Sequence, residues 1–262
     1  CKAKMGEEKN PPFMAQNADE WLAKAPESVQ NELREAREIV ERERQGVRYA
    51  VATYAVLDKA SSWRQQALSV NLGESADLQT SRLALLAQQQ KLAEIHTELG
   101  SELDSEAAYM KAASVMQMVT SDTATTPRTT ETLEMVSGTL ITLLATITDN
   151  SGLSLDPDLP SYYLMSAALM HGPRVIDATI SLRSQGYVAL KSGQTTPEIA
   201  ARIGAHSAIA LHELQGAKIA LAKVKQASPM AADLMVTNAP LASEAFLNQI
   251  QAQLSQGSPG VS

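Results

Sequence analysis

A helical pattern that runs without a break for about 45 residues constrains this fold most. It begins near Pro26, which suits the first turn of a helix, and reaches about Val70. Such a helix spans roughly 65 Å, which favours an elongated bundle over a compact globule. Its large apolar residues fall seven apart, as in a coiled coil or a helix bundle: Leu33, Val40, Val47 and Tyr54, with Leu68 two heptads further.

The rest of the chain also reads as helix. Alanine, leucine, glutamine and glutamate dominate long stretches, and these residues are strong helix formers. A second helical pattern follows the first, is interrupted by a bend at Gly100 and then continues. Beyond the first helix, the sequence predicts helices over about 78–99, from there to 119, and over 127–149, 160–191, 197–227 and 231–254. Thr126-Pro127 and Thr196-Pro197 are expected to begin two of them and Gly193 to end one. A kink is expected at His171-Gly172-Pro173. We therefore predict an all-α fold, an elongated helical bundle of six or seven helices arranged as two stacked four-helix modules.

The two ends of the chain differ from this helical region in composition. Residues 1–20 read as a flexible leader or tether, 21–255 as the helical domain, and 256–262 as a disordered tail. Cys1 is the only cysteine, so an intramolecular disulfide is excluded. Cys1 either marks only where the sequence begins or is the lipid-carrying cysteine of a processed lipoprotein. No apolar run approaches the length of a membrane span.

Charge and motif content narrow the function. The formal net charge is −7, aromatic residues make up 4%, and no dense Lys/Arg block occurs, so we expect no nucleic-acid binding. The sequence holds no phosphate loop, nucleophile elbow or HExxH motif, and we predict a protein that is not an enzyme and needs no cofactor. His206 and His212 are six residues apart and face different ways on a helix, so we expect no metal site.

The stretch 149–165, DNSGLSLDPDLPSYYLM, separates two helical patterns. Asp156 and Asp158 are expected to cap the helix that begins near Pro160, because a carboxylate accepts hydrogen bonds from free N–H groups at a helix start. Tyr162 and Tyr163 follow in its first turn. Their side chains point about 100° apart, so at most one of them faces the core directly, while the other lines a pocket or a dimer seam.

Two segments resemble signatures of a known family: ERERQGVRY, from Glu41 to Tyr49, and SLDPDLPSYYLM, from Ser154 to Met165. They are similar to the extracytoplasmic helical sensor domains, of the helical bimodular type, that occur on bacterial chemoreceptors, sensor kinases and diguanylate cyclases. The resemblance covers roughly Glu35 to Leu254, and the second signature is the more specific. It implies two stacked four-helix bundles, a small organic acid as ligand, and a parent protein anchored in the membrane.

The chain also departs from the family pattern. Where the family tends to show His-Arg-Gly, this sequence has Trp63-Arg64-Gln65, so only the arginine is kept. Pro160 and Ser166 stand where the family usually has aspartate. These differences indicate a divergent member or one that recognises another ligand.

Arg64 is the first candidate for ligand binding. It falls on the same heptad position as Ala50 and Leu57, and a guanidinium on a bundle seam needs a partner. Its planar fork suits a carboxylate, which a ligand or a glutamate of the bundle can supply. Drift of the heptad pattern towards the rim of the bundle is the third possibility.

Further candidates come from both signatures and from the kinked helix. Arg48 lies one helical turn after Arg44, so both can face one partner, although alternating ERER charges more often form a solvated face. Tyr162 and Tyr163 are candidate ligand contacts. Arg174 and Arg183 lie on opposite sides of one helix, so at most one points inward, and Arg174 joins the ligand-binding candidates.

Two histidines share apolar stripes with their helices. His96 follows Leu85 and Leu92 at heptad spacing, and His206 lies on a stripe with Ile203 and Ala210. We interpret both as hydrogen-bonded core histidines rather than as ligands of a metal or small molecule.

Taken with the resemblance, these features predict the periplasmic sensor domain of a bacterial transmembrane signal transducer, similar to a chemotaxis receptor. It would bind a small ligand such as an organic acid, transmit a helix shift and act as a homodimer. The alternative is a helical protein-binding module or lipoprotein that recognises a partner protein and takes no small-molecule ligand.

Overall fold

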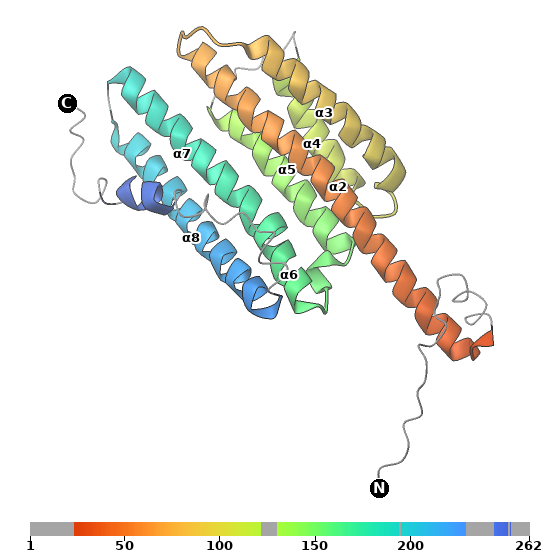
Figure 1. Cartoon of the computed structure of the whole chain (residues 1–262). Coiled ribbons are helices and arrows are strands. Elements are labelled where there is room, and N and C mark those ends of the chain that lie inside the picture. The colour runs from red at the N-terminus through yellow and green to blue at the C-terminus, as the bar shows by residue number, and fades with distance from the viewer. Residues whose placement is uncertain (1–23, 122–129, 194, 229–243, 251, 253–262) are drawn as a thin grey trace. The chain divides into compact units, whose positions relative to one another are not determined.

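The computed structural model describes residues 24–121, 130–193, 195–228, 244–250 and 252. These residues form helices and turns and contain no strand, which confirms the all-α bundle (Figure 1). The elements are α2 (Glu27–Asn71), α3 (Leu78–Leu99), α4 (Glu106–Thr120), α5 (Thr130–Asn150), the 3-10 helix η1 (Leu153–Leu155), α6 (Leu159–Met165), the π-helix η2 (Ser166–His171), α7 (Gly172–Ser192) and α8 (Pro197–Ala227). Residues 244–250 are also helical.

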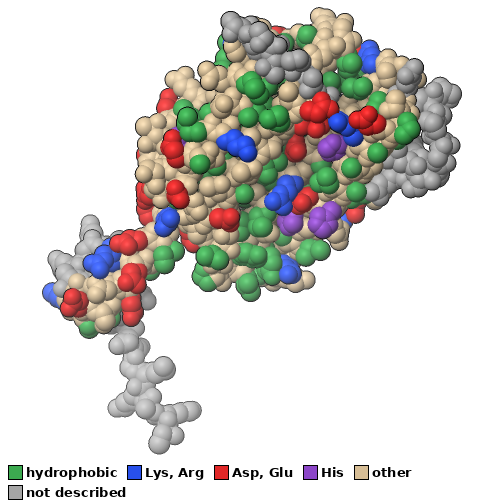
Figure 2. All heavy atoms as spheres, turned by 180° about the vertical axis from the view of Figure 1, so that it is seen from behind, with side chains coloured by type: hydrophobic (Ala, Val, Ile, Leu, Met, Phe, Trp, Pro, Cys, Tyr) green, Lys and Arg blue, Asp and Glu red, His purple; other side chains and the backbone are tan. Residues whose placement is uncertain are grey.

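The chain divides into two compact units, Cys1–Arg44 and Gln45–Ser262, and α2 runs through both. In the first unit, the described residues are half-buried or exposed. In the second unit, the long helices run alongside one another, with α7 and α8 as one neighbouring pair (Figure 1). Figure 2 shows acidic and basic side chains interspersed on one face of the molecule.

The second unit has two apolar cores that belong to different helices. The larger core joins α2, α3, α4 and α5 around fully buried side chains such as Trp63, Leu85, Met116 and Leu140. The smaller core joins α7, α8 and residues 244–250, where Leu182, Leu214 and Leu247 meet. Stacking of two four-helix modules stays a prediction.

Of the two expected seam positions of α2, the one that holds Ala50 and Leu57 is buried. In the other series, Leu33, Val40 and Val47 are 38%, 54% and 47% exposed and do not face a core, whereas Tyr54 packs against the larger core and Leu68 is buried. The buried series begins at Gly46 and continues through Ala50, Leu57, Trp63 and Arg64, among others. At 3.6 residues per turn, Val47 lies about 125° around the helix from the centre of this buried face. Small side chains on that face let neighbouring helices approach, and larger ones such as Leu57 and Trp63 fill the core there.

Local sequence signals set several helix ends as predicted. The Asp158 carboxylate accepts a hydrogen bond from the Ser161 amide at 3.1 Å, and Asp156 accepts one from the Asp158 amide at 2.8 Å. The first bond confirms Asp158 as the N-cap of α6, whereas Asp156 holds the cap residue in place and does not bond a free amide of the helix. Thr196 likewise caps α8 through the Ile199 amide at 3.2 Å. Gly193, at φ 64°, ends α7 in the left-handed conformation that glycine adopts easily.

The bend expected at Gly100 is a full reversal between two antiparallel helices. Asp104 takes the left-handed conformation there, with φ 42°. The Asn150 amide, at the end of α5, donates hydrogen bonds to the carbonyls of Leu103 at 2.9 Å and Asp104 at 3.2 Å. The reversal is therefore held by a helix that lies far along the sequence, which explains why the local pattern indicated only a bend.

The kink expected around His171-Gly172-Pro173 is present as a π-helix. Residues Ser166–His171 adopt the wider i to i+5 hydrogen-bond pattern just before Gly172 and Pro173 begin α7. Proline has no N–H to continue the regular ladder, so the carbonyls before it need other partners. The Tyr54 hydroxyl, from α2, donates to the Ala168 carbonyl at 2.9 Å.

Other expectations lie outside the described residues. These are the leader 1–20 with Cys1, the Thr126-Pro127 helix start, the beginning of the helix predicted over 231–254, and the tail 256–262.

Candidate functional site

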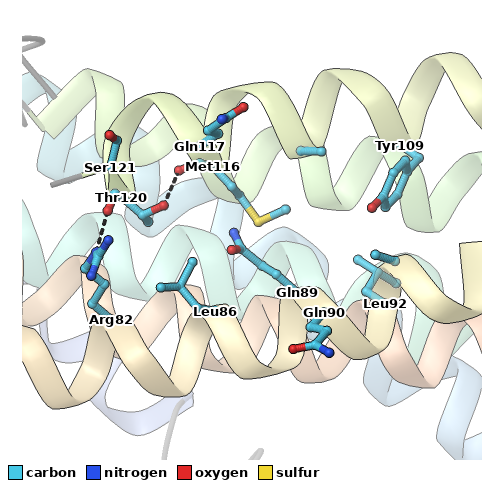
Figure 3. A pocket seen from close by; sticks show the side chains of 12 residues that line it. Arg82, Leu86, Gln89, Gln90, Leu92, Tyr109, Met116, Gln117, Thr120 and Ser121 are labelled. Carbon is cyan, nitrogen blue, oxygen red and sulfur yellow. Dashed lines mark hydrogen bonds between the residues drawn. The ribbon is translucent and has the colours of Figure 1, made fainter. Parts of the chain in front are cut away.

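A groove between α3 and α4 forms a cavity in the described part of the chain. Its volume is about 540 Å³, within the range of small-molecule sites. Figure 3 shows it in the space between the two helices. The lining residues are Arg82, Leu86, Gln89, Gln90, Leu92, Ala93, Tyr109, Ala113, Met116, Gln117, Thr120 and Ser121.

Apolar side chains form the floor of the groove, and polar groups stand around it. Leu92 and Met116 are buried beneath it. The Gln89 amide lies between the two helices, near Met116, and the Tyr109 ring hangs from α4 at one end of the view (Figure 3). An apolar floor with a few directed polar groups is the usual composition of a small-molecule site.

Arg82 stands at the other end of the groove and is engaged. Its Nε donates to the carbonyl of Thr120 at 2.5 Å, and Thr120 is the last residue of α4. The guanidinium thus balances the negative end of the α4 dipole. The Thr120 hydroxyl donates to the Met116 carbonyl at 2.7 Å (Figure 3), so this end of the groove is fixed by hydrogen bonds within the protein.

Tyr109 connects the groove to the interior. Its ring stacks on the ring of His96, with centroids 3.6 Å apart and planes 15° apart. His96 Nε2 lies 2.8 Å from a carboxylate oxygen of Glu106, and His96 Nδ1 lies 2.6 Å from the hydroxyl of Tyr49. Because the carboxylate can only accept, the neutral ring carries its proton on Nε2, and Tyr49 donates to Nδ1. The groove is thereby joined through α3 to α2.

Burial keeps the two tyrosine hydroxyls of this network protonated. It raises the pKa of Tyr49 to about 12, opposed by a hydrogen bond from Ser105. It also raises the pKa of Tyr109, with a smaller contribution from the negative charge of Glu106. Both hydroxyls are therefore neutral at physiological pH. His96 is a hydrogen-bonded core histidine, as expected from its apolar stripe.

Arg64 is fully buried where α2, α5, α7 and α8 meet. Its Nη1 donates to Asp177 at 3.1 Å, and its Nη2 donates to Glu134 at 3.3 Å and to the Ser181 hydroxyl at 2.8 Å. His206 Nε2 lies 3.8 Å from the same Glu134 oxygen. The sequence allowed a ligand carboxylate, a glutamate of the bundle, or a position at the rim of the bundle. In the structure, Arg64 pairs within the bundle, and its partners are an aspartate and a serine as well as a glutamate.

The environment of Arg64 combines opposing effects. Burial lowers the pKa of the guanidinium, and the charges of Asp177 and Glu134 oppose that shift. Arg64 Nε is buried and has no hydrogen-bond partner among the described residues. Asp177 and Glu134 retain 27% and 25% side-chain exposure, so the ion pairs reach towards solvent. A role for Arg64 in ligand binding stays a prediction.

Arg48 forms an exposed ion pair across two helices. Its two terminal nitrogens donate to the two oxygens of Glu98 at 2.5 and 2.7 Å. This bond raises the pKa of Arg48 and lowers that of Glu98. Both side chains are about half exposed. Arg44, one turn earlier, pairs instead with Glu41 at 3.1 Å on its own helix, so the two arginines do not share a partner.

Tyr162 and Tyr163 pack against each other edge to face, with centroids 5.3 Å apart. Lys223 of α8 donates to the Tyr163 hydroxyl at 3.0 Å, and its ammonium lies 4.5 Å from the centre of that ring. Tyr163 therefore ties α6 to α8. Both tyrosines are half-buried.

Arg174 lies in a cluster with Glu213 and His171. Its Nη1 lies 3.7 Å from Glu213, whose other oxygen accepts a hydrogen bond from His171 Nδ1 at 2.8 Å. Arg183, on the opposite side of α7, lines a separate cavity of about 380 Å³ between α2 and α7. None of the five predicted ligand-binding residues, Arg64, Arg48, Tyr162, Tyr163 and Arg174, lines the α3–α4 groove.

Sequence reasoning missed the groove residues Arg82, Gln89, Tyr109 and Gln117. Glutamines on a helix surface look like ordinary solvated positions, and the groove exists only because α3 and α4 pack side by side after the reversal. Two signals were available. Tyr109 is one of few aromatic residues, and the run Gln88-Gln89-Gln90 places three uncharged amides where a surface helix often carries charges.

Comparisons with protein-family models, with characterised proteins and with solved structures found no match to this chain. Among the described residues, no helix is both long and apolar enough to cross a membrane. The same residues contain no group of three or more His, Cys, Asp or Glu side chains placed to hold a metal ion.

Proposed function

We propose that this chain is a non-catalytic sensor domain that binds a small organic molecule in the α3–α4 groove. The observation that carries the proposal is the contact chain from the groove to α2: Tyr109 stacks on His96, and His96 is hydrogen-bonded to Tyr49. A molecule that fills the groove touches Tyr109 directly. Its binding is therefore coupled to the position of α2.

The coupling works through a shift of packed helices. A ligand that favours one position of Tyr109 favours the matching position of the His96 ring and of α2, because interiors this densely packed do not deform freely. Helix shifts of about 1–2 Å are typical of such transitions. Tyr49 ends the first signature, ERERQGVRY, so the proposed signal reaches a segment that carries the resemblance to bacterial sensors.

The resemblance supports the wider setting of the proposal. In it, the chain is the periplasmic part of a transmembrane signal transducer similar to a chemotaxis receptor, and the parent protein is anchored in the membrane. The ligand is an organic acid or a molecule of similar size. At Trp63, Pro160 and Ser166 the chain differs from the family pattern, so the resemblance constrains the ligand class less than it constrains the setting.

Dimerisation through α2 is part of the same proposal. Leu33, Val40, Val47 and Val51 are 38–63% exposed and recur along one side of this helix, at the spacing of a helix–helix seam. Val40→Glu is expected to shift the chain from dimer to monomer in sedimentation velocity. Glu38→Gln, also on α2 but off this series, serves as the control. A chain that is monomeric before any substitution contradicts this part.

A thermal-shift screen tests the sensor function. The panel contains organic acids, amino acids and uncharged heterocycles, each at about 100 times the dissociation constant of a true ligand. Binding at that excess stabilises the folded chain by about 2.7 kcal/mol, which raises the melting temperature by about 5 °C or more at this size.

Ala93→Phe makes the test specific for the groove. Ala93 lines the groove, so a phenylalanine there fills part of it. Ala87→Phe places the same side chain on an exposed position of α3 outside the lining and is the control. The proposal expects the ligand-induced shift to disappear in Ala93→Phe and to persist in Ala87→Phe. Equal shifts in both variants, or no shift with any compound, contradict it.

A protein-binding module is the second candidate, favoured by exposed apolar side chains in the segment between α5 and α7. Leu155, Leu159 and Leu164 are 82%, 59% and 45% exposed. Exposed apolar residues of this size often contact a partner. Under this alternative, no compound in the panel binds, and Leu155→Ser with Leu159→Ser abolishes binding to a partner protein while the melting temperature stays unchanged.

A further inference from the structure

We infer that the α3–α4 groove takes an uncharged, planar heterocycle whose edge carries an N–H donor beside a ring-nitrogen or C=O acceptor, such as a free purine or pyrimidine base. This inference rests on the proposed function and names the ligand class of the same groove. It departs from the organic acid that the resemblance implies, for reasons of charge, hydrogen bonding and ring stacking.

The charge of the groove does not suit an acid. Among the described residues that line it, Arg82 is the single charged side chain and none is a carboxylate. Arg82 holds the carbonyl end of α4 through its Nε bond to Thr120. A carboxylate that enters such a groove loses water, and it needs a cation placed for it to offset that loss. An uncharged ligand avoids this requirement.

The groove offers amides in place of a cation. The side-chain amides of Gln89 and Gln117 make no hydrogen bond with other described residues, whereas the Gln90 amide donates to Glu94 at 3.4 Å. Each glutamine amide presents one acceptor and two donors in a plane. This pattern matches a ligand edge with a donor beside an acceptor, which is how glutamine reads the edge of adenine. The Gln89 amide points into the space between the helices (Figure 3).

Tyr109 supplies a stacking platform. His96 covers one face of its ring at 3.6 Å, so the groove meets the remaining face, the ring edge and the hydroxyl. The ring cannot turn freely, because His96 is itself fixed between Tyr49 and Glu106. A flat aromatic ligand stacks on such a fixed ring, and stacking tolerates any base because each has a π face.

The apolar floor of the groove suits the flat face of a base. Leu86, Ala93 and Met116 present apolar surface beneath the amides. A planar base places one face on apolar atoms and its polar edge towards Gln89. The volume of about 540 Å³ suits a single base with room for bound water.

Isothermal titration calorimetry on the full chain tests the inference with four probes: adenine, hypoxanthine, uracil and malate. The expected result is binding of at least one base and no binding of malate. Gln89→Glu keeps the shape of the side chain, removes its donors and adds a negative charge. It is expected to weaken base binding by about tenfold or more, since each mismatched hydrogen bond near 1.4 kcal/mol is a factor of ten.

Two further variants separate the stacking surface of the Tyr109 ring from its hydroxyl. Tyr109→Leu removes the stacking surface and is expected to abolish base binding, whereas Tyr109→Phe keeps the ring and retains most of it. Gln88→Glu, the same substitution on the neighbouring residue outside the lining, is expected to leave base affinity unchanged.

The outcomes distinguish this inference from the proposed function. Malate binding that is lost in Ala93→Phe overturns the ligand class and leaves the sensor function standing. Base binding that is unaffected by Gln89→Glu and Tyr109→Leu overturns the groove as the site. Absence of binding by every compound in the wider panel overturns both.

Discussion

The Tyr49 hydroxyl lies 2.6 Å from Nδ1 of His96, and this hydrogen bond joins α2 to α3 inside the larger core. Tyr49 has no exposed surface, and His96 is 8% exposed. His96 continues to Glu106 on one side and stacks on Tyr109 on the other. One imidazole thus fixes the relative positions of three helices and touches the wall of the groove.

Removing the Tyr49 hydroxyl tests the strength of this link. Tyr49→Phe leaves the ring in place and deprives His96 Nδ1 of its donor, and an unsatisfied buried acceptor costs about 1–3 kcal/mol. Urea denaturation is expected to show this loss as a lower midpoint with an unchanged slope. Tyr187→Phe, at a hydroxyl with no recorded hydrogen bond, is the control and is expected to change the midpoint little. Equal midpoints for the two variants contradict the prediction.

Alkaline pH is expected to destabilise the fold through two tyrosines. Burial raises the pKa of both Tyr49 and Tyr54 to about 12, from a value of 10.0 in the unfolded chain. The folded state holds these protons more tightly, so their contribution is fully present below pH 10 and is lost as the pH rises towards 12. Ultraviolet absorbance of tyrosinate should show at least two late-titrating groups. Titration of every tyrosine near pH 10 in the folded chain argues against the prediction.

Loss of the Arg64 guanidinium is expected to destabilise the junction of four helices. Arg64→Leu leaves Asp177 and Glu134 without their cation, and breaking a buried pair in this way costs about 3 kcal/mol, at the low end because both carboxylates are partly exposed. Chemical denaturation measures the loss. Arg64→Leu combined with Asp177→Leu is expected to recover part of it, and a double variant that is no more stable than the single one contradicts the pairing.

Two glycine-to-alanine substitutions are expected to act in opposite directions. Gly138 lies within α5, and an added Cβ there meets nothing within 4 Å. Gly138→Ala should stabilise the chain by about 0.5–1 kcal/mol, because alanine loses less entropy in a helix. At Gly100, the added Cβ collides with the His96 ring, so Gly100→Ala should lower the melting temperature. Scanning calorimetry compares the two, and a shift of the same sign for both is the contrary result.

The sequence predicted those features that short segments determine. The α3 boundaries, Leu78–Leu99, follow from apolar spacing and from Asp77, whose carboxylate accepts from the Thr80 amide at 3.0 Å. The Asp158 and Thr196 caps follow from residue types that satisfy free amides at a helix start. In each case, the stabilising partner lies within a few residues.

Features that depend on distant partners were not predictable in this way. Arg64 was correctly placed on a buried seam, but Glu134 and Asp177 lie 70 and 113 residues further along the chain. On α2, the predicted seam of Ala50 and Leu57 is buried, whereas Leu33, Val40 and Val47 of the other series are exposed. A heptad pattern alone does not show which part of a long helix its neighbours cover. The groove needed both α3 and α4 in place before its glutamines could be recognised.

The π-helix Ser166–His171 has a consequence for protein engineering and for the history of the gene. A π-helix holds one residue more than the regular helix that would span the same length, as if a single codon had been inserted. Deleting one residue between Ser166 and His171 would therefore restore regular i to i+4 spacing and leave the residues before it at nearly the same angle relative to α7. Tyr163 should then keep its contact with Lys223, whereas a single-residue deletion within the regular part of α7 would turn the preceding residues by about 100° and break that contact.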